Sequence, residues 1–223
     1  MTKIKICGIK TLPNALAAIE AGADLLGFNF YPKSPRYIAP ESCAEITAIL
    51  REKHPAITLV GVFVNSRAHE VRAALQTARL HLAQLHGDEP PEMLAELQPH
   101  AFKALRLKSD VGTDWKTDNR ISGFIRYFVS QSAPPPTPAL LVDAAAPGLY
   151  GGSGQIANWS AASELSKQFP LLLAGGLTLE NVAEAIRKVQ PWGVDVASGV
   201  ESAPGIKDRE KMQAFVKAVR GTR

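Results

Sequence analysis

The sequence predicts an α/β protein whose fold is a closed (β/α)8 barrel, the TIM barrel, formed as a single domain over residues 1–223. Short apolar runs alternate with amphipathic helical patterns eight times along the chain. These runs are mostly continuous, which is typical of strands buried on both faces of a parallel sheet. The first run lacks a following Gly-x-Gly-x-x-Gly turn, which disfavours the alternative, an open doubly wound sheet. Barrels usually have ~250 residues, so this shorter chain should have short loops.

The eight expected strands are runs rich in Val, Leu and Ile. They are Ile4–Cys7, Leu25–Phe30, Thr58–Val64, Leu80–Leu85, Ala101–Leu107, Ala139–Asp143, Leu171–Ala174 and Val194–Ala197. Before the sixth run lies the proline-rich segment Ser132–Pro138, which fits neither a helix nor a central strand. It would suit an interdomain linker, but the strand–helix alternation continues beyond it, so we interpret it as a surface loop.

The expected helices follow the strands in order and carry apolar residues at helical spacing. They are Leu12–Ala21, Ser42–Lys53, Arg67–Thr77, a helix entered through Pro90 and Pro91, a helix within Asp118–Ser130, Ala161–Gln168, Leu179–Lys188 and Asp208–Arg220. Gly22 is a typical stop for the first helix. Ser66, Thr178 and either Asn158 or Ser160 are the expected N-caps of three others.

Composition and charge exclude several classes of protein. Apolar residues make up 46% and charged residues 21%, which is ordinary for a globular protein and excludes disordered and collagen-like chains. The net charge of +4 is mild, and the basic residues are spread along the chain. We therefore expect no nucleic-acid partner, and we note that the charge suits an anionic small substrate.

Cysteine usage and the N-terminus bear on the cell compartment. Two cysteines, Cys7 and Cys43, do not make a disulfide framework. The N-terminus lacks the apolar run of a signal peptide, and no run reaches the ~18 residues of a membrane span. The histidines and carboxylates show no metal-ligand spacing. We expect a soluble cytoplasmic protein, without a membrane partner, a metal or a cofactor.

Glycines at the ends of the last two strands predict a phosphate site. The active site of such a barrel lies at the carboxyl ends of its strands, and the loops after the seventh and eighth strands often bind phosphate. Gly175-Gly176 and Ser198-Gly199 end these strands in this chain. Without a Cβ, glycine lets backbone N–H groups approach an anion closely. The alternative is that these glycines only make tight turns.

Two strand ends carry groups that can move protons. Cys7 ends the first strand, where it is either a nucleophile or base, or a small buried hydrophobe. Asp143 ends the apolar sixth strand, so its carboxylate is either paired or functional. An acid–base pair made of these two suits an isomerase, which moves protons without net redox change. Cys43, inside a helical pattern, is assigned to packing.

Other polar residues near the strand ends have less specific interpretations. Arg36 follows two prolines, in a stiff loop where it could grip a substrate carboxylate, or it is simply a surface residue. His86 and Asp88 after the fourth strand are expected to fix their loop, with His86 bonded to backbone. Asp195, within the eighth strand, is expected to pair with Lys5 or a neighbouring strand-end group.

Taken together, the strand ends resemble those of the phosphoribosylanthranilate isomerases of tryptophan biosynthesis. The similar segments follow the family's order and span nearly the whole chain: Lys5–Ile9, Gly27–Arg36, Val60–Asn65, Gln84–Glu89, Leu141–Ala144, Gly151–Gly154, Leu173–Leu177 and Ser198–Glu201. Each segment alone is a weak signal, whereas the set is highly specific.

The resemblance implies a reaction and residue roles. N-(5-phosphoribosyl)anthranilate would undergo an Amadori rearrangement to 1-(2-carboxyphenylamino)-1-deoxyribulose 5-phosphate. It implies that Asp143 is the general acid, Cys7 the general base and Arg36 the anchor of the anthranilate carboxylate. The implied phosphate-binding residues are Gly154, Gly175, Gly176, Ser198 and Gly199. The resemblance requires no metal or cofactor.

The sequence departs from the family pattern at a few positions and leaves rival functions to be excluded. Asn158 stands where the family often has Asp, and Ala197 where Ser is frequent. Other phosphosugar barrels, such as indole-glycerol-phosphate synthase or ribulose-phosphate epimerase, use a Lys–Glu pair or a metal, which the pair of Cys7 and Asp143 disfavours. A non-catalytic phosphate-binding barrel stays possible, as do acceptance of a related histidine-pathway substrate and either a monomer or a homodimer.

Overall fold

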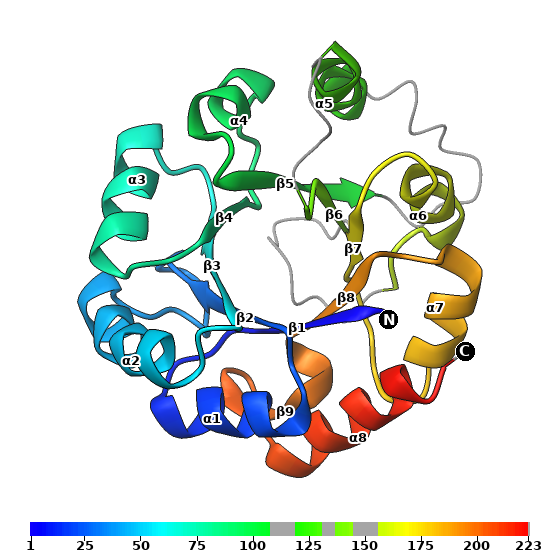
Figure 1. The fold of residues 1–223 in the computed structure, drawn as a ribbon. Helices are drawn as coiled ribbons and strands as arrows, with labels where there is room; N and C mark the ends of the chain where they lie inside the picture. The colour runs from blue at the N-terminus through cyan, green and yellow to red at the C-terminus, as the bar shows by residue number, and fades with distance from the viewer. Residues whose placement is uncertain (108–118, 131–136, 145–155, 223) are drawn as a thin grey trace.

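The structure, a computed structural model, describes residues 1–107, 119–130, 137–144 and 156–222. Eight parallel strands form a closed barrel in sequence order, β1 pairing with both β2 and β8, so the predicted fold class is confirmed (Figure 1). The strands are β1 Lys3–Cys7, β2 Leu25–Asn29, β3 Thr58–Phe63, β4 Leu82–Leu85, β5 Ala101–Leu107, β6 Leu140–Ala144, β7 Leu171–Leu173 and β8 Gly193–Val196.

The helices form a ring around the barrel (Figure 1). They are α1 Leu12–Ala21, α2 Pro40–Lys53, α3 Ala68–Thr77, α4 Pro91–Leu97, α5 Asn119–Ser130, α6 Trp159–Ser166, α7 Val182–Val189 and α8 Arg209–Arg220. After β8 the chain forms a short 3₁₀ helix, Ser198–Val200, and then the hairpin of β9 Glu201–Ala203 and β10 Ile206–Lys207. The sequence analysis did not anticipate this hairpin.

Two of the predicted helix caps are wrong. Helix α3 begins one residue later than expected, and its first turn is held by the Glu70 carboxylate, which accepts from the Arg67 N–H at 2.7 Å, rather than by Ser66. Helix α7 begins at Val182, not Leu179, because Asn181 accepts from the Thr178 N–H and the chain between them forms a turn.

The predicted cap of α6 is right in its first alternative. The Asn158 side chain accepts from the Ala161 N–H at 3.0 Å, which satisfies one of the free donors of the first turn. An asparagine therefore performs the capping that an aspartate would perform at this position. The proline-rich segment before β6 lies largely outside the described residues, so its interpretation as a surface loop stays a prediction.

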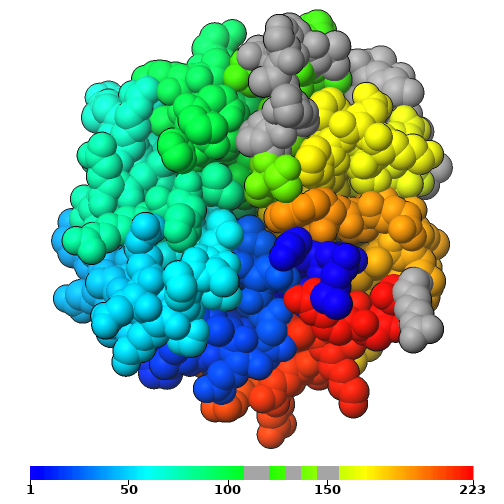
Figure 2. All heavy atoms as spheres, in the orientation of Figure 1, coloured from blue at the N-terminus to red at the C-terminus, as the bar shows by residue number. Residues whose placement is uncertain are grey.

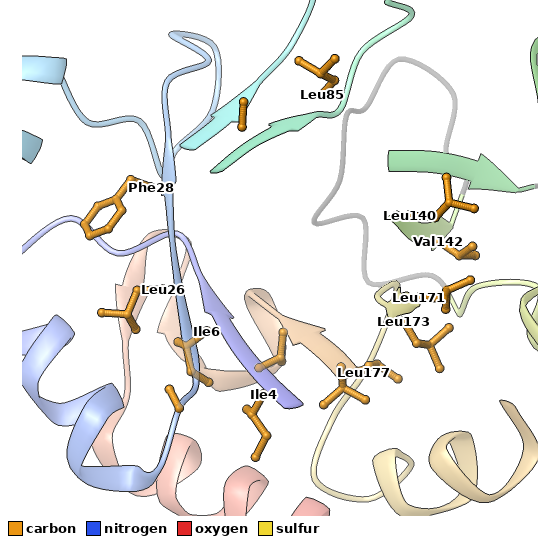
Figure 3. Packing of buried hydrophobic residues seen from close by; sticks show 14 of the residues in the cluster. Ile4, Ile6, Leu26, Phe28, Leu85, Leu140, Val142, Leu171, Leu173 and Leu177 are labelled. Carbon is orange, nitrogen blue, oxygen red and sulfur yellow. The ribbon is translucent and has the colours of Figure 1, made fainter. Parts of the chain in front are cut away.

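The alternation of side chains along each strand creates two apolar layers. Outward-facing residues pack against the helices, and Figure 3 shows Ile4, Phe28 and Leu173 among those that point away from the barrel centre. Inward-facing residues fill the barrel itself: Leu25, Val60, Phe102, Ala104, Leu141, Leu172 and Ala174. Accordingly, no open channel is visible on the face shown in Figure 2. Burial of both faces explains the continuously apolar strands.

The same alternation carries polar residues to the inner face near the carboxyl ends of the strands. Ile4 and Ile6 face outward, so Lys5 and Cys7 face inward, and Leu140 and Val142 likewise leave Asp143 inside. Within the described part of the chain, no helix is long and apolar enough to cross a membrane. Because the inward-facing polar side chains gather at the inner rim of the barrel, the candidate active site lies there.

Candidate active site

Cys7 is the last residue of β1, and its thiol is buried beside a buried ion pair. Lys5 Nζ donates to Asp195 Oδ1 at 2.8 Å, which confirms one of the pairings expected for Asp195. The pair forms because Lys5 and Asp195 are register partners in the adjacent strands β1 and β8, both on the inner face. Burial raises the pKa of the Cys7 thiol, and the positive charge of Lys5 opposes that effect.

Cys43 behaves as the sequence analysis expected. It lies fully buried in α2, within the apolar layer between the helices and the barrel. Burial alone raises the pKa of its thiol to about 12. This thiol is therefore packing material, and it shows what burial does to a cysteine that has no cation beside it.

Asp143, the next-to-last residue of β6, is a buried carboxyl group with a partner at each oxygen. Oδ1 accepts from the Ala144 N–H at 2.8 Å, and Oδ2 lies 3.1 Å from Nε2 of His86. The other ring nitrogen of His86 lies 2.6 Å from Nε2 of Gln84. With the amide in this orientation Gln84 donates to Nδ1, so a neutral ring carries its proton on Nε2 and donates it to Asp143.

The role expected for His86 is therefore wrong, while Asp88 does serve its loop. The His86 side chain does not bond to backbone but reaches across the barrel interior from the end of β4 to β6. Asp88 pairs with Arg106 and its N–H donates to Asn65 Oδ1 at 2.7 Å. The one signal available for His86 was its position directly after a strand end; nothing in the spacing predicted its partner.

The glycine-bearing ends of β7 and β8 line one pocket together with both inner carboxylates. The lining residues are Asp143, Ala174, Gly175, Gly176, Leu177, Asp195, Val196, Ala197 and Ser198. Within the described part of the chain, the backbone N–H groups of Gly176, Ser198 and Gly199 donate no hydrogen bond to protein. Gly176 and Ser198 line the pocket and Gly199 follows directly in the chain. Unpaired backbone donors beside a pocket suit an anion.

These positions also require glycine for steric reasons. Gly175 and Gly176 have φ angles of +82° and +59°, in the left-handed region. A Cβ on Gly199 would lie 2.1 Å from the carbonyl oxygen of Leu177, and one on Gly175 would lie 3.0 Å from Asp143 Oδ1. The glycines thus make tight turns and also bring free N–H groups beside the pocket, so the two interpretations of these glycines are compatible.

Asn181 is a further residue of this region, which the sequence analysis did not assign to the site. Its Nδ2 donates to the carbonyl oxygen of Gly176 at 2.8 Å, while its Oδ1 accepts from the Thr178 N–H at 2.9 Å. These two bonds fix the turn after β7, in which Gly176 lies. Gly154, also expected at the phosphate, lies outside the described residues.

Arg36 lies over the end of β1 and is held by an acidic partner. Its Nε and Nη2 donate to the two carboxylate oxygens of Glu201 at 2.8 and 2.7 Å. Its side chain passes so close to Gly8 that a Cβ there would lie 2.6 Å from Cδ of Arg36. Since Gly8 directly follows Cys7, the guanidinium lies beside the end of the first strand, with its Nη1 edge not engaged by Glu201.

Glu201 in turn contacts a second cation. Lys207 Nζ donates to Glu201 Oε1 at 2.8 Å and to the carbonyl oxygen of Ala197 at 2.9 Å. Burial raises the pKa of Glu201, but the hydrogen bonds from Arg36 and Lys207 outweigh this effect and hold the pKa below its usual range. Glu201 was visible in the sequence only as the last residue of the segment Ser198–Glu201, with no sign of its partners.

The arrangement defines a class of enzyme. No group of three or more metal-ligating side chains occurs among the residues that the structure describes. The inner rim instead combines a thiol, a carboxyl group, an anchored guanidinium and a pocket of free N–H donors. Such a combination in a (β/α)8 barrel suits an acid–base enzyme whose substrate carries anionic groups.

Comparisons with known proteins identify the family. Residues 4–218 match the family model of N-(5'phosphoribosyl)anthranilate (PRA) isomerase. The N-(5'-phosphoribosyl)anthranilate isomerase of Geotalea uraniireducens is 46% identical over 221 residues, covering 99% of this chain and 100% of the relative. That of Roseiflexus sp. is 44% identical and covers 99% of this chain and 98% of the relative. The chain therefore belongs to the N-(5'-phosphoribosyl)anthranilate isomerase family.

Solved structures agree with this assignment. The crystal structure of phosphoribosyl anthranilate isomerase from Thermotoga maritima is 35% identical, with a TM-score of 0.81, and covers 99% of this chain and 100% of that one. A phosphoribosyl anthranilate isomerase in complex with reduced 1-(o-carboxyphenylamino)-1-deoxyribulose 5-phosphate is 34% identical, with a TM-score of 0.78 and coverage of 99% and 100%.

Proposed function

We propose that this chain converts N-(5'-phosphoribosyl)anthranilate to 1-(2-carboxyphenylamino)-1-deoxyribulose 5-phosphate, a step of tryptophan biosynthesis. Membership of the family over nearly the whole chain supports the reaction. The observation that carries the assignment to this site is the junction of Asp143 with the pocket of Gly175, Gly176 and Ser198. A carboxyl group beside an anion pocket suits a substrate whose phosphate lies close to a sugar-ring oxygen.

In the first step Asp143 acts as the general acid. It gives its proton to the ring oxygen of the ribose, the bond between that oxygen and C1 breaks, and the nitrogen lone pair forms the C1=N bond of a Schiff base. His86 and the Ala144 N–H, which hold the two carboxyl oxygens, fix the direction in which the acid points. General acid–base catalysis of this kind contributes roughly 10²–10⁴-fold in rate.

In the second step Cys7 acts as the general base. Its thiolate takes the proton from C2, the C–H electrons form the C1=C2 bond, and the C1=N electrons return to nitrogen. The enolamine then tautomerises to the aminoketone: the C2 hydroxyl loses its proton, the C2=O bond forms, and C1 takes up a proton. A buried thiol whose pKa is raised is a stronger base once ionised, but less of it is ionised at neutral pH. We therefore expect kcat to rise with pH above neutrality until Cys7 is ionised.

The remaining roles concern binding. Arg36 holds the anthranilate carboxylate with the guanidinium N–H groups that Glu201 does not use. The N–H groups of Gly176, Ser198 and Gly199 hold the phosphate, with Gly175 giving the close approach and Gly154 adding a contact from the loop after β6. Each of these groups has a fixed position in the site, so substrate binding depends on these specific contacts and not on the net charge of +4.

The test is an assay on freshly made substrate, whose fluorescence is followed as it is consumed. We expect the wild type to be active, and Cys7→Ser and Asp143→Asn each to lose roughly 10²–10⁴-fold in kcat. Cys43→Ser, which changes the other thiol, is the matched control and should retain kcat. If Cys7→Ser or Asp143→Asn stays near wild type, the assigned base or acid is wrong; if the wild type is inactive but binds phosphate, the chain is a binding protein.

The oligomeric state and the compartment complete the proposal. One similar structure, 34% identical with a TM-score of 0.79, is described as mutually generated monomers of the dimeric isomerase from Thermotoga maritima. This supports a monomer or homodimer for the present chain, which light scattering distinguishes. Both cysteines are free thiols, which suits a reducing cytoplasm.

A further inference from the structure

A buried lysine beside Cys7 has no role in the mechanism so far. The Lys5 side chain is 0% exposed, and its ammonium group donates to Asp195 Oδ1. Burying such a pair brings little or no net stability, because the cost of removing two charges from water offsets their attraction. The position of the pair is therefore the informative feature: Lys5 lies beside Cys7, and Asp195 lines the pocket.

The absence of a side chain at Gly27 brings the ammonium group and the sulfur into one small space. Gly27 on β2 is the register partner of Cys7, and a Cβ on it would lie 2.7 Å from Cys7 Sγ and 3.0 Å from Lys5 Nζ. Both atoms thus lie against the same bare backbone position. Lys5 and Cys7 share the inner face of β1, so a charge on one acts directly on the other in a dry environment.

The groups that face Cys7 come from three elements. Lys5 lies on β1, Asp195 on β8 and Lys207 at the end of β10, while β2 offers the uncharged Gly27. Burial disfavours the thiolate, Lys5 and Lys207 favour it, and the carboxylate of Asp195 disfavours it. Burial lowers the pKa of Lys5, but the attraction of Asp195 and Cys7 outweighs this effect and holds the pKa above its usual range. The ammonium group therefore stays charged.

We propose that Lys5 is a positioning residue that stabilises Cys7 as a thiolate, and that Asp195 limits how much of the lysine charge reaches the sulfur. The inference rests on the proposed function, in which Cys7 takes the C2 proton. In that step the C–H bond breaks, the S–H bond forms, and the sulfur changes from anion to neutral. Lys5 stays an ammonium and Asp195 a carboxylate throughout, so neither exchanges a proton with the substrate.

The two partners predict shifts of opposite sign. Lys5→Met keeps the length of the side chain but removes the charge, so the thiolate loses its counter-ion and the pKa of Cys7 should rise by about 1 unit or more. Asp195→Asn keeps the shape but removes the opposing carboxylate, so the pKa of Cys7 should fall. If the ion pair had only a structural role, the two substitutions would not shift the pKa of the Cys7 thiol in opposite directions.

The experiment is an ultraviolet titration of the thiolate in the substrate-free protein. Each variant is measured with and without Cys7→Ser, so that the difference belongs to Cys7. Lys103→Met is the matched control, because Lys103 is another buried lysine paired with a carboxylate, Glu89, but it does not face Cys7. We expect it to leave the titration of Cys7 unchanged.

The same shifts should appear in the pH profile of kcat. The rise of kcat should occur at higher pH in Lys5→Met and at lower pH in Asp195→Asn than in the wild type. An unchanged Cys7 titration in folded Lys5→Met, or a rise in Asp195→Asn, overturns the inference. If Lys5→Met does not fold, the direction of the shift in Asp195→Asn alone decides. Failure of the proposed function is seen separately, as an active Cys7→Ser variant, whatever the titration shows.

Discussion

Replacing Glu201 with glutamine tests whether Arg36 is held in place for a ligand. Glu201→Gln keeps the size of the side chain but removes the negative charge that three hydrogen bonds reach, two from Arg36 and one from Lys207. Removing one partner of a buried ion pair costs about 3–5 kcal/mol. Because 11% of the Arg36 side chain is exposed, water screens the loss, and we expect the lower value, about 3 kcal/mol.

This loss has two measurable consequences. For a chain of this length about 3 kcal/mol lowers Tm by roughly 6–12 °C. In catalysis, a loosened Arg36 loses one contact with the substrate carboxylate, worth about 1.5–3 kcal/mol, so KM should rise by roughly 10–100-fold while kcat changes little. Calorimetry and the fluorescence assay measure the two effects on one protein preparation.

The stability effect should also depend on pH. The folded pKa of Glu201 lies below its unfolded value, so its contribution is fully present above an unfolded pKa of about 4.3 and is lost as the pH falls through the folded value. The difference in Tm between wild type and Glu201→Gln should therefore be largest near neutral pH and shrink in acid.

A matched control uses the same chemical change at an exposed pair. Glu96 bonds to Arg72 at 2.7 Å, with side-chain exposures of 51% and 45%, so Glu96→Gln should cost only about 0–1 kcal/mol and leave KM unchanged. If Glu201→Gln behaves like Glu96→Gln in both Tm and KM, the reasoning about Arg36 and Glu201 is refuted.

Three further outcomes are expected. Arg36→Met should weaken the affinity for a reduced product analogue by roughly 10–100-fold in a calorimetric titration, and undiminished affinity would remove Arg36 from the site. Gly199→Ala, whose Cβ would lie 2.1 Å from a carbonyl oxygen, should weaken inhibition by inorganic phosphate about tenfold or more, whereas unaltered inhibition would speak against the cradle. Partial burial raises the pKa of Asp24, but the hydrogen bonds from Lys3 and Arg220 outweigh this effect and hold the pKa below its usual range. Asp24→Asn should therefore lower Tm at neutral pH but not at a pH below the folded pKa of Asp24. An equal loss of Tm at all pH values would contradict this.

The fold was predictable because its signals are local and repeated. The stretch Leu140-Leu141-Val142 of β6 is apolar on both faces, since helices cover one face and the barrel interior the other. The positions of Cys7 and Asp143 could be predicted for the same reason, because each lies at the carboxyl end of such a strand. Helix starts were less predictable: Ser66 and Thr178 are plausible caps, but Glu70 accepts from the Arg67 N–H at the start of α3, and Asn181 accepts from the Thr178 N–H in the turn before α7.

The contacts that shape the site were not predictable in the same way. Arg36 and Glu201 are 165 residues apart and meet because the β9–β10 hairpin folds against the loop after β2. His86 directly follows β4 and Asp143 lies on β6, and these two strands are not neighbours in the sheet. Periodicity gives the face on which a residue lies, but not the reach of its side chain across the barrel.

One buried ammonium group links the two ends of the site. Lys207 Nζ contacts the carbonyl oxygen of Ala197, directly before the Ser198 and Gly199 donors, and also Oε1 of Glu201, which holds Arg36. In the function proposed above, these contacts set the spacing between the donors that hold the phosphate and the guanidinium that holds the carboxylate. A ligand that carries both groups at that spacing loses most of its translational and rotational freedom with the first contact, so the second contact costs little more. Its affinity should therefore exceed that of phosphate or anthranilate alone.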